Sequence, residues 1–142
     1  MKKIAIVFWS GTGNTEKMAR EIAKGVQENG AEATVFTPAE FSADLVAAYD
    51  KIAFGCPSMG MEELEDYEFE PMFTALEKKL ADKEIALFGS YGWGDCTWMR
   101  NWQARCSSAG AQIFGNEGLC VNGTPDLENL AKCYELGKAL AS

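Results

Sequence analysis

The chain has 142 residues, a mass of 15.5 kDa and an apolar fraction of 47%, which suits one domain with one sizeable core. Its net charge of −8 and pI of about 4.6 argue against nucleic acid as a partner, because phosphates are bound by Lys and Arg. Histidine is absent, so the commonest general base and metal ligand is missing. Any chemistry is therefore expected to come from a cofactor.

Targeting and metal-site signals are also missing. No apolar run approaches the ~20 residues that span a bilayer. The first three residues lead into a strand-like run without a small-residue cleavage site, so a cytoplasmic location is predicted. No C-x-x-C occurs, which excludes the usual zinc and iron–sulfur spacings and predicts no metal. The odd cysteine count predicts reduced thiols, mostly in the core, at Cys56, Cys96, Cys106, Cys120 and Cys133.

Strand-like and helix-like segments alternate through the first half of the chain. Residues 3–8 form a β-branched apolar run, which predicts a buried strand. Residues 15–29 predict a helix that Gly30 ends. Residues 33–36 predict a short second strand, closed by Thr37 and Pro38, and residues 51–55 predict the third. The expected inner face of the helix consists of Met18, Ala19, Ile22, Ala23 and Val26.

The alternation continues in the second half. A helix is predicted over residues 71–80 with Pro71 in its first turn, then a fourth strand over 84–89 and a helix over 98–109. Two apolar stretches, 113–114 and 119–121, predict an interrupted fifth strand. Thr124 and Pro125 are expected to start the last helix. Its predicted inner face consists of Leu127, Leu130, Ala131 and Tyr134.

This pattern predicts a single α/β domain over residues 1–142. Five strands alternating with helices imply a doubly wound parallel sheet with helices on both faces. The right-handed crossover rule favours the strand order 2-1-3-4-5. In such a sheet a ligand binds beyond the carboxyl ends of the strands, between strands one and three.

The loop after the first strand is rich in hydroxyl groups and glycine. It reads Trp9, Ser10, Gly11, Thr12, Gly13, Asn14 and Thr15. Glycine lets backbone N–H groups close around an anion, and the following helix adds a partial positive charge. The loop contains neither Lys nor Arg and matches neither a G-K-[ST] ending nor a full G-x-G-x-x-G. We therefore expect it to bind a phosphate monoester; the plain alternative is a polar turn with a helix cap.

The run Ser10-Gly11-Thr12-Gly13-Asn14-Thr15 resembles the phosphate loop of the flavodoxins, which bind flavin mononucleotide (FMN) non-covalently. The likeness continues in residues 55–60, 62–65, 88–95 and 98–100, covers essentially the whole chain and is closest to the short-chain flavodoxins. It implies the flavodoxin-like fold. It also implies a low-potential one-electron carrier, rather than an enzyme, that shuttles electrons between redox partner proteins.

The resemblance gives roles to the loop after the third strand. Ser58 and Met59 match cofactor-binding positions, and the thioether of Met59 suits contact with one face of the flavin ring. Gly60-Met61 corresponds to a redox-linked turn whose peptide rotates when the flavin gains an electron, a change that glycine permits. Met61 departs from the small or polar residue usual there, and Glu62 matches the carboxylate at the pyrimidine edge. A core methionine and an ordinary turn glycine are the alternatives.

The loop after the fourth strand supplies the other side of the expected site. Trp93 between two glycines is expected to stack on the second flavin face, and the alternative is a core tryptophan. Trp9 is expected to lend its backbone rather than its ring, and Asn122-Gly123 to close the far edge of the ring. The cofactor-binding residues predicted in this loop are Ser90, Tyr91, Gly92, Trp93, Gly94 and Asp95.

Six of the 21 acidic residues fall within residues 62–70. Residues 55–70 and 89–99 contain no Lys or Arg, so a reduced, anionic flavin would lie beside carboxylates. We expect the acidic run to lower the second reduction potential and to dock basic redox proteins on a monomer. A solvated loop without such effects is the alternative.

Two other functions fit the same fold class. An FMN-dependent quinone or nitro reductase would need a pocket for a second substrate, for which the short connections leave little material. A phosphoacceptor signalling domain would need acidic residues where this chain has Trp9-Ser10 and Cys56-Pro57, and it is rejected.

Overall fold

The first strand carries apolar residues on both of its faces, so the sheet has to be covered on both faces. The computed structural model describes residues 1–61, 63–92 and 94–142, and in it β1 (Lys3–Phe8) is central. It pairs in parallel with β2 (Glu32–Phe36) and β3 (Lys51–Gly55). The next strand, β4 (Glu84–Tyr91), pairs with β3, and both β5 (Gln112–Ile113) and β6 (Leu119–Asn122) pair with β4. The predicted order 2-1-3-4-5 and the interrupted fifth strand are confirmed.

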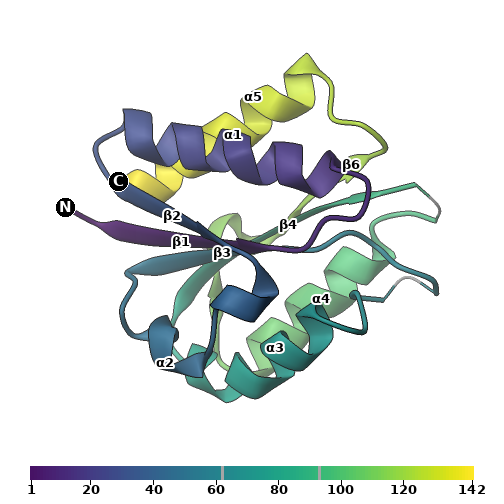
Figure 1. Ribbon diagram of the computed structural model, residues 1–142, viewed down its shortest axis with the longest axis horizontal. Coiled ribbons are helices and arrows are strands. Elements are labelled where there is room, and N and C mark those ends of the chain that lie inside the picture. The colour runs from purple at the N-terminus through teal and green to yellow at the C-terminus, as the bar shows by residue number, and fades with distance from the viewer. Residues whose placement is uncertain (62, 93) are drawn as a thin grey trace.

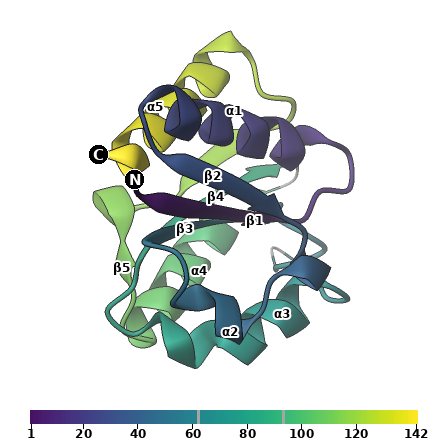
Figure 2. The same ribbon diagram turned by 60° about the vertical axis from the view of Figure 1, so that its left-hand side comes forward.

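The helices form a layer on each side of the sheet, as Figures 1 and 2 show. One layer contains α1 (Asn14–Glu28) and α5 (Leu127–Ala141), and Ile4, Ile6 and Phe8 pack under it. The other contains α3 (Phe69–Leu76) and α4 (Thr97–Ser108), with Ala5 and Val7 facing it. Two hydrophobic cores therefore lie on opposite faces of one sheet.

Short helical pieces that the sequence analysis did not predict fill the connections. A 3₁₀ turn (Pro38–Glu40) and α2 (Ala43–Val46) lie between β2 and β3. The helix predicted over 71–80 starts two residues earlier, as α3, and ends in a 3₁₀ turn (Glu77–Leu80). A third 3₁₀ turn (Phe114–Asn116) separates β5 from β6. No helix within the described ranges has the length and hydrophobicity that crossing a membrane requires.

The predicted inner face of the last helix was half wrong, since Leu130 and Tyr134 are half-buried but the other two residues are not. Leu127 is 87% exposed and Ala131 is also exposed, whereas Cys133, Gly137 and Leu140 are buried. The cause is a close backbone contact with α1: a Cβ on Gly137 would lie 2.0 Å from the Ile22 carbonyl oxygen. The helix also starts later than predicted, at Leu127, where the Asp126 carboxylate accepts a bond from the Asn129 N–H at 2.8 Å.

The prediction that all five cysteines are reduced was also wrong. Cys96 and Cys120 form a disulfide, with Cα atoms 6.3 Å apart. Cys56, Cys106 and Cys133 are free and buried, as expected. The bonded pair is half-buried and packs against the core under α3 and α4.

Candidate functional site

Three loops meet at the carboxyl edge of the sheet, on the right of Figure 1. They follow β1, β3 and β4, and they surround a cavity of about 250 Å³. Gly123, just after β6, also lines it. The lining residues from the three loops are Trp9, Gly11, Thr12 and Asn14; Pro57, Ser58 and Met59; and Ser90, Tyr91 and Gly92.

The first loop is built as an anion cradle. The Ser10 hydroxyl accepts bonds from the backbone N–H groups of Gly13, at 3.1 Å, and Glu16, at 3.2 Å, which fixes the start of α1. Gly13 has φ 98°, a conformation that glycine tolerates. Four backbone N–H groups find no acceptor among the described residues, and they belong to Gly11, Thr12, Asn14 and Thr15. Free donors at the N-terminus of a fifteen-residue helix fit a phosphate monoester.

Polar contacts tie this loop to the other two. The Thr15 and Ser90 hydroxyls, both buried, lie 3.2 Å apart and join the first loop to the third. The Trp9 N–H donates to the Gly55 carbonyl at 3.0 Å. Its ring is used as well, which the sequence analysis did not expect: the indole N–H donates to the Glu68 carboxylate at 2.6 Å. The three loops are therefore one connected structure.

A tight hairpin forms the second loop. Met59 and Glu63 exchange two backbone bonds, of 2.8 and 2.9 Å. Gly60, inside the hairpin, has φ 52°, and a Cβ there would meet no atom within 4 Å. Met59 lines the cavity and Met61 is 81% exposed. Glu62, predicted at the pyrimidine edge, lies outside the described residues.

The third loop extends the edge of β4. The Tyr91 ring lies 5.5 Å from that of Trp98, and the Tyr91 carbonyl accepts a bond from the Gly123 N–H at 2.7 Å. Gly123 also lines the cavity, and closure of the far ring edge by Asn122 and Gly123 stays a prediction. Asp95 accepts a bond from the Thr97 N–H at 2.8 Å at the start of α4. The predicted ring contact Trp93 lies outside the described residues.

The predicted residues therefore divide into lining and supporting ones. Among the described residues, the cavity lining omits seven predicted positions: Ser10, Gly13, Thr15, Gly60, Met61, Gly94 and Asp95. Pro57 lines the cavity but was not in the predicted set, although it directly follows Cys56 at the end of the third strand. Its position in that loop is the sequence signal that could have identified it as a lining residue.

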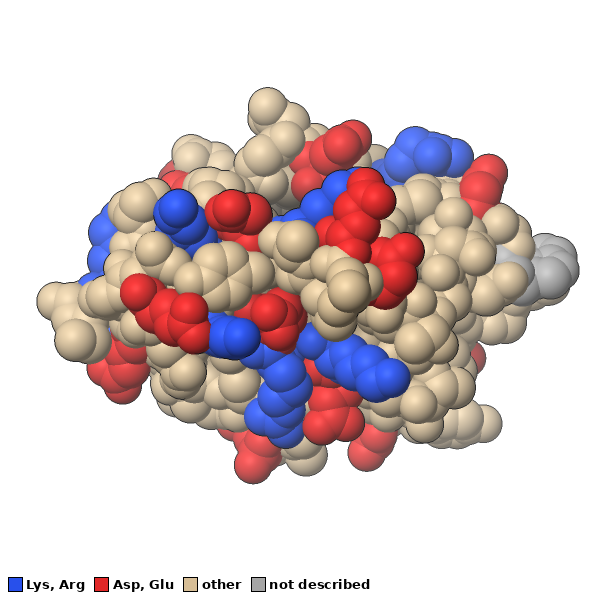
Figure 3. All heavy atoms as spheres, turned by 90° about the horizontal axis from the view of Figure 1, so that it is seen from above, with Lys and Arg blue, Asp and Glu red and all other residues tan. Residues whose placement is uncertain are grey.

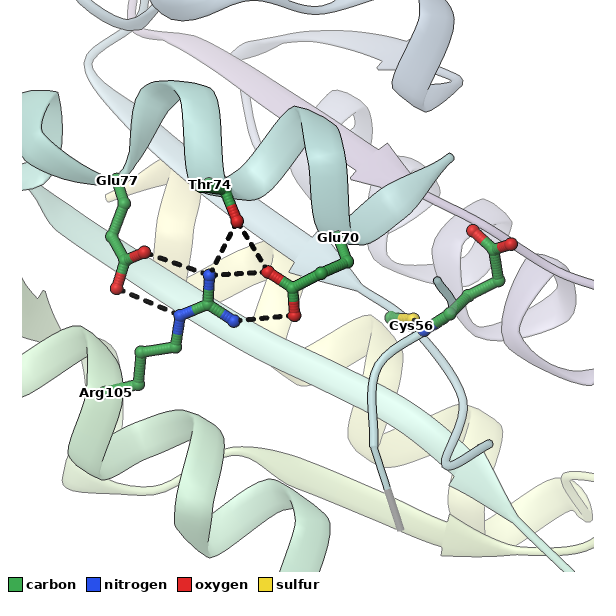
Figure 4. Close-up of polar contacts among 6 residues, drawn as sticks. Cys56, Glu70, Thr74, Glu77 and Arg105 are labelled. Carbon is green, nitrogen blue, oxygen red and sulfur yellow. Dashed lines mark hydrogen bonds and ion pairs between the residues drawn. The ribbon is translucent and has the colours of Figure 1, made fainter. Parts of the chain in front are cut away.

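The acidic run is not one exposed surface. Glu65 is 4% exposed, and its carboxylate accepts bonds from the backbone N–H groups of Tyr67, Glu68 and Phe69, each at 2.8 Å. It therefore organises the start of α3. Figure 4 shows Glu70 turned toward Arg105 of α4. The exposed acidic residues described in the run are Glu63, Asp66 and Glu68.

Arg105 links α4 to α3 through two carboxylates. It donates to both oxygens of Glu70, at 2.9 and 2.7 Å, and to both oxygens of Glu77, at 2.9 Å (Figure 4). These bonds hold the pKa of Glu70 below its ordinary value of 4.5. They also raise the pKa of Arg105. Glu70 is thus part of the framework beneath the site.

The surface over α1 and α5 carries charges of both signs, unlike the acidic run. Over α1 and α5, basic and acidic side chains are interspersed, as Figure 3 shows. One pair there is Arg20 with Glu16, at 3.3 Å. The stretches without Lys or Arg, residues 55–70 and 89–99, carry seven acidic residues in a chain of net charge −8. Two of these seven, Glu70 and Asp95, pair with Arg105 and Arg100 of α4.

Comparison with known proteins agrees with this geometry. A family model described as "Flavodoxin" matches residues 6–137. A flavodoxin of Megasphaera elsdenii is 48% identical over 97% of this chain and 98% of its own length. A flavodoxin of Clostridium beijerinckii is 43% identical over 96% of this chain and 98% of its own length.

The fold agrees as well. The solution structure of two-electron reduced Megasphaera elsdenii flavodoxin superposes with a TM-score of 0.89 at 47% identity, covering 97% of this chain and 98% of that one. An electron carrier, and not the quinone or nitro reductase weighed above, is the activity of this family. The chain therefore belongs to the flavodoxin family: it binds FMN and transfers electrons to and from redox partner proteins.

Proposed function

We propose that the cavity between the three loops holds the FMN, non-covalently, and that the carboxyl edge of the sheet is where electrons enter and leave. When bound, FMN supplies the one-electron chemistry. The chain supplies an anion cradle in its first loop, a thioether from Met59, a turn at Gly60, and the Tyr91–Gly92 wall. Glu62 and Trp93 keep their predicted roles at the pyrimidine edge and on the second ring face.

One observation carries this proposal. The first loop has four backbone N–H groups without acceptors among the residues described, three of them in the cavity lining at Gly11, Thr12 and Asn14, and it contains no Lys or Arg. Dipoles alone suit a phosphate monoester better than a triphosphate, which needs a cation. The neighbouring lining from Pro57 to Met59 and from Ser90 to Gly92 is mostly apolar or neutral, as a flavin ring requires.

The charge around the cavity and the single sheet support the proposals on reduction potential, partners and oligomeric state. The exposed carboxylates of Glu63, Asp66 and Glu68 disfavour a second negative charge, which makes the second reduction potential low. The same carboxylates attract basic redox proteins, whereas nucleic acid is repelled. All strands belong to one sheet, consistent with a single domain over residues 1–142 that acts as a monomer. A cytoplasmic location is part of the same proposal, alongside relatives described as flavodoxins over nearly the whole chain.

Comparing FMN with riboflavin, which lacks the phosphate, tests the anion cradle. Thr12 is exposed, and its hydroxyl makes no bond to another described residue, so Thr12→Val removes a donor without breaking the fold. A bond to a charged group contributes about 1.5 kcal/mol, so FMN should bind roughly tenfold more weakly and riboflavin equally well. Titration of the apoprotein, followed by flavin fluorescence, measures both constants.

Thr124→Val is the matched control, because Thr124 is exposed and does not line the cavity. It should change neither constant. An equal loss of FMN and riboflavin affinity in Thr12→Val would mean that the first loop does not hold the phosphate.

A further inference from the structure

The disulfide joins two segments that wall the cavity. Cys96 ends the loop that contributes Ser90, Tyr91 and Gly92 to the lining. Cys120 lies in β6, opposite Gly89 of β4, and Gly123 follows that strand into the cavity wall. The bond therefore crosses between two parts of the same wall.

The two ends of the loop are tied to different neighbours. At its near end, Tyr91 pairs with β6 and accepts the bond from the Gly123 N–H at 2.7 Å. At its far end, the Cys96 carbonyl accepts bonds from the N–H groups of Met99 and Arg100 in α4, at 3.1 and 3.0 Å. The disulfide is the covalent link between this far end and β6.

The same two sulfurs are the reactive ones in this chain. Cys96 and Cys120 are half-buried, whereas the three free cysteines are buried. Burial raises the pKa of Cys106 and of Cys133 to about 12, and that of Cys56 further, so these thiols are poor nucleophiles. Cys96 is the N-cap residue of α4, where helix N–H groups stabilise a thiolate.

We propose that Cys96 and Cys120 form a reversible redox site whose disulfide state strengthens flavin binding. The proposal rests on the flavin site described above. In a reducing compartment, disulfides are mostly transient and redox-sensing rather than structural. The reductant is a dithiol, either a small molecule or a protein of the thioredoxin class.

The reaction is ordinary thiol–disulfide exchange. A thiolate of the dithiol attacks Cys120 Sγ, forms a mixed disulfide and releases Cys96 as the thiolate, which its helix position stabilises. The second thiol of the reductant then displaces Cys120, and the reductant leaves as a disulfide. Two electrons and two protons pass to the chain, which ends with two thiols.

The effect on FMN binding follows from how well ordered the third loop is before FMN binds. With the bond intact, both ends of the loop are joined to β6, through the pairing of Tyr91 and through Cys96, and Tyr91 and Gly92 wall the cavity. With the bond reduced, FMN has to order the far end of the loop when it binds, so its affinity falls. Linkage requires the converse: FMN must favour the disulfide by the same factor. A tenfold change in affinity therefore appears as a shift of about 30 mV in the two-electron disulfide potential.

The test measures FMN dissociation constants for the oxidised apoprotein and for the protein reduced with dithiothreitol. Alkylation followed by mass spectrometry verifies the thiol count in each sample. We expect about tenfold weaker binding after reduction, and faster amide exchange in residues 91–96. Redox titration with thiol buffers, with and without FMN, should show the disulfide potential about 30 mV lower with FMN.

Two variants separate the disulfide from general effects of the reductant. The double variant Cys96→Ser/Cys120→Ser should bind as the reduced protein does, with or without dithiothreitol. Cys106→Ala keeps the pair and should respond as the parent chain does. Equal dissociation constants in both states, or five free thiols in the protein as isolated, would overturn the proposal and leave the flavin site standing. Failure of the oxidised protein to bind FMN would overturn the site as well.

Discussion

Gly60 is the residue at which the proposed redox role of a backbone turn can be tested most directly. It has φ 52°, and the bonds between Met59 and Glu63 close the hairpin around it. No atom lies within 4 Å of where a Cβ would be, so a side chain there would be strained only by the backbone angle. A substitution at Gly60 therefore tests conformation without a steric clash.

Gly60→Ala should lower the first reduction potential. A Cβ in the left-handed region costs roughly 1–2 kcal/mol and penalises the turn that faces the reduced ring. For one electron this corresponds to about 40–90 mV. Spectroelectrochemical titration measures the change. Gly30→Ala is the control, because Gly30 has φ 88°, has equally open surroundings and follows α1 at the opposite edge. Unchanged potentials in Gly60→Ala would show that the turn does not switch.

Single residues also mark the limit of prediction at the site. The hydroxyls and glycines of the first loop predicted anion binding, because an anion cradle needs those residue types at one strand end. Glu65 carried no such signal: among five neighbouring acidic residues, nothing in the sequence singles out the one that is buried. Its role became visible only when three backbone N–H groups were found around one carboxylate.

Between elements, the contact of α3 with α4 depends on Arg105. Arg105→Met removes bonds to Glu70 and Glu77 and leaves two partly buried carboxylates unpaired. Because Glu70 is 35% exposed, solvent screens part of the loss, and we expect about 1–2 kcal/mol less stability at pH 7. Denaturant unfolding measures it. Arg100→Met, whose pair with Asp95 at 3.7 Å is exposed, should change stability little.

The same variant should show a defined pH dependence. The pKa of Glu70 is lowered in the folded protein, so its contribution is complete above its ordinary value of 4.5. It is lost as the pH falls through the lowered folded value. The stability difference between the parent chain and Arg105→Met should therefore be constant from pH 6 to 8 and shrink below about pH 4. A difference that stays constant down to pH 3 would contradict the role of this pair.

The packing of α1 against α5 depends on Gly137, because glycine has no side chain to separate the two helices. Gly137→Ala would place a Cβ 2.0 Å from the Ile22 carbonyl oxygen and push the helices apart. In a helix without this contact, glycine to alanine would stabilise by about 0.5–1 kcal/mol. We expect the opposite sign here, a loss of about 1–3 kcal/mol in denaturant unfolding. Stabilisation would mean that the two backbones do not touch.

Periodicity predicted elements well where large apolar residues define a face. The α1 face from Met18 to Val26 and the β1 run were correct for this reason. It failed for α5, because the contact there is made by Cys133 and Gly137, which weigh little in a hydrophobic pattern. The disulfide was beyond sequence reasoning too: two cysteines 24 residues apart meet only because β6 returns to pair with β4.

For the molecule as a whole, the exposed acidic residues should set the rate of partner docking. Because Glu65 is buried and Glu70 is paired, Glu63 and Asp66 are the residues to neutralise. Glu63→Gln/Asp66→Asn should slow electron transfer with a basic reductase at low salt, and the difference should vanish at high salt. Stopped-flow rates across a salt series test this. Rates equal to those of the parent chain at every salt concentration would exclude docking here.

The same double variant should raise the second reduction potential. At ~10 Å and an effective dielectric near 20, each unit charge raises the energy of a reduced, anionic ring by about 1.7 kcal/mol before screening. Potentiometry on the same samples measures the change. Glu32→Gln/Glu135→Gln is the control, since both residues are exposed on β2 and α5, away from the three loops. It alters net charge equally and should leave rates and potential almost unchanged.

The uneven distribution of carboxylates should also orient the molecule as it approaches a charged surface. Seven acidic residues lie in the two base-free stretches at the carboxyl edge, and at the amino edge Lys51 pairs with Glu84. We expect the exposed carboxylates of Glu63, Asp66 and Glu68 to make the end of the molecule that carries the proposed cofactor cavity electrically negative. A positively charged surface, whether a protein or a coated electrode, would therefore rotate the molecule during approach and meet the redox end first.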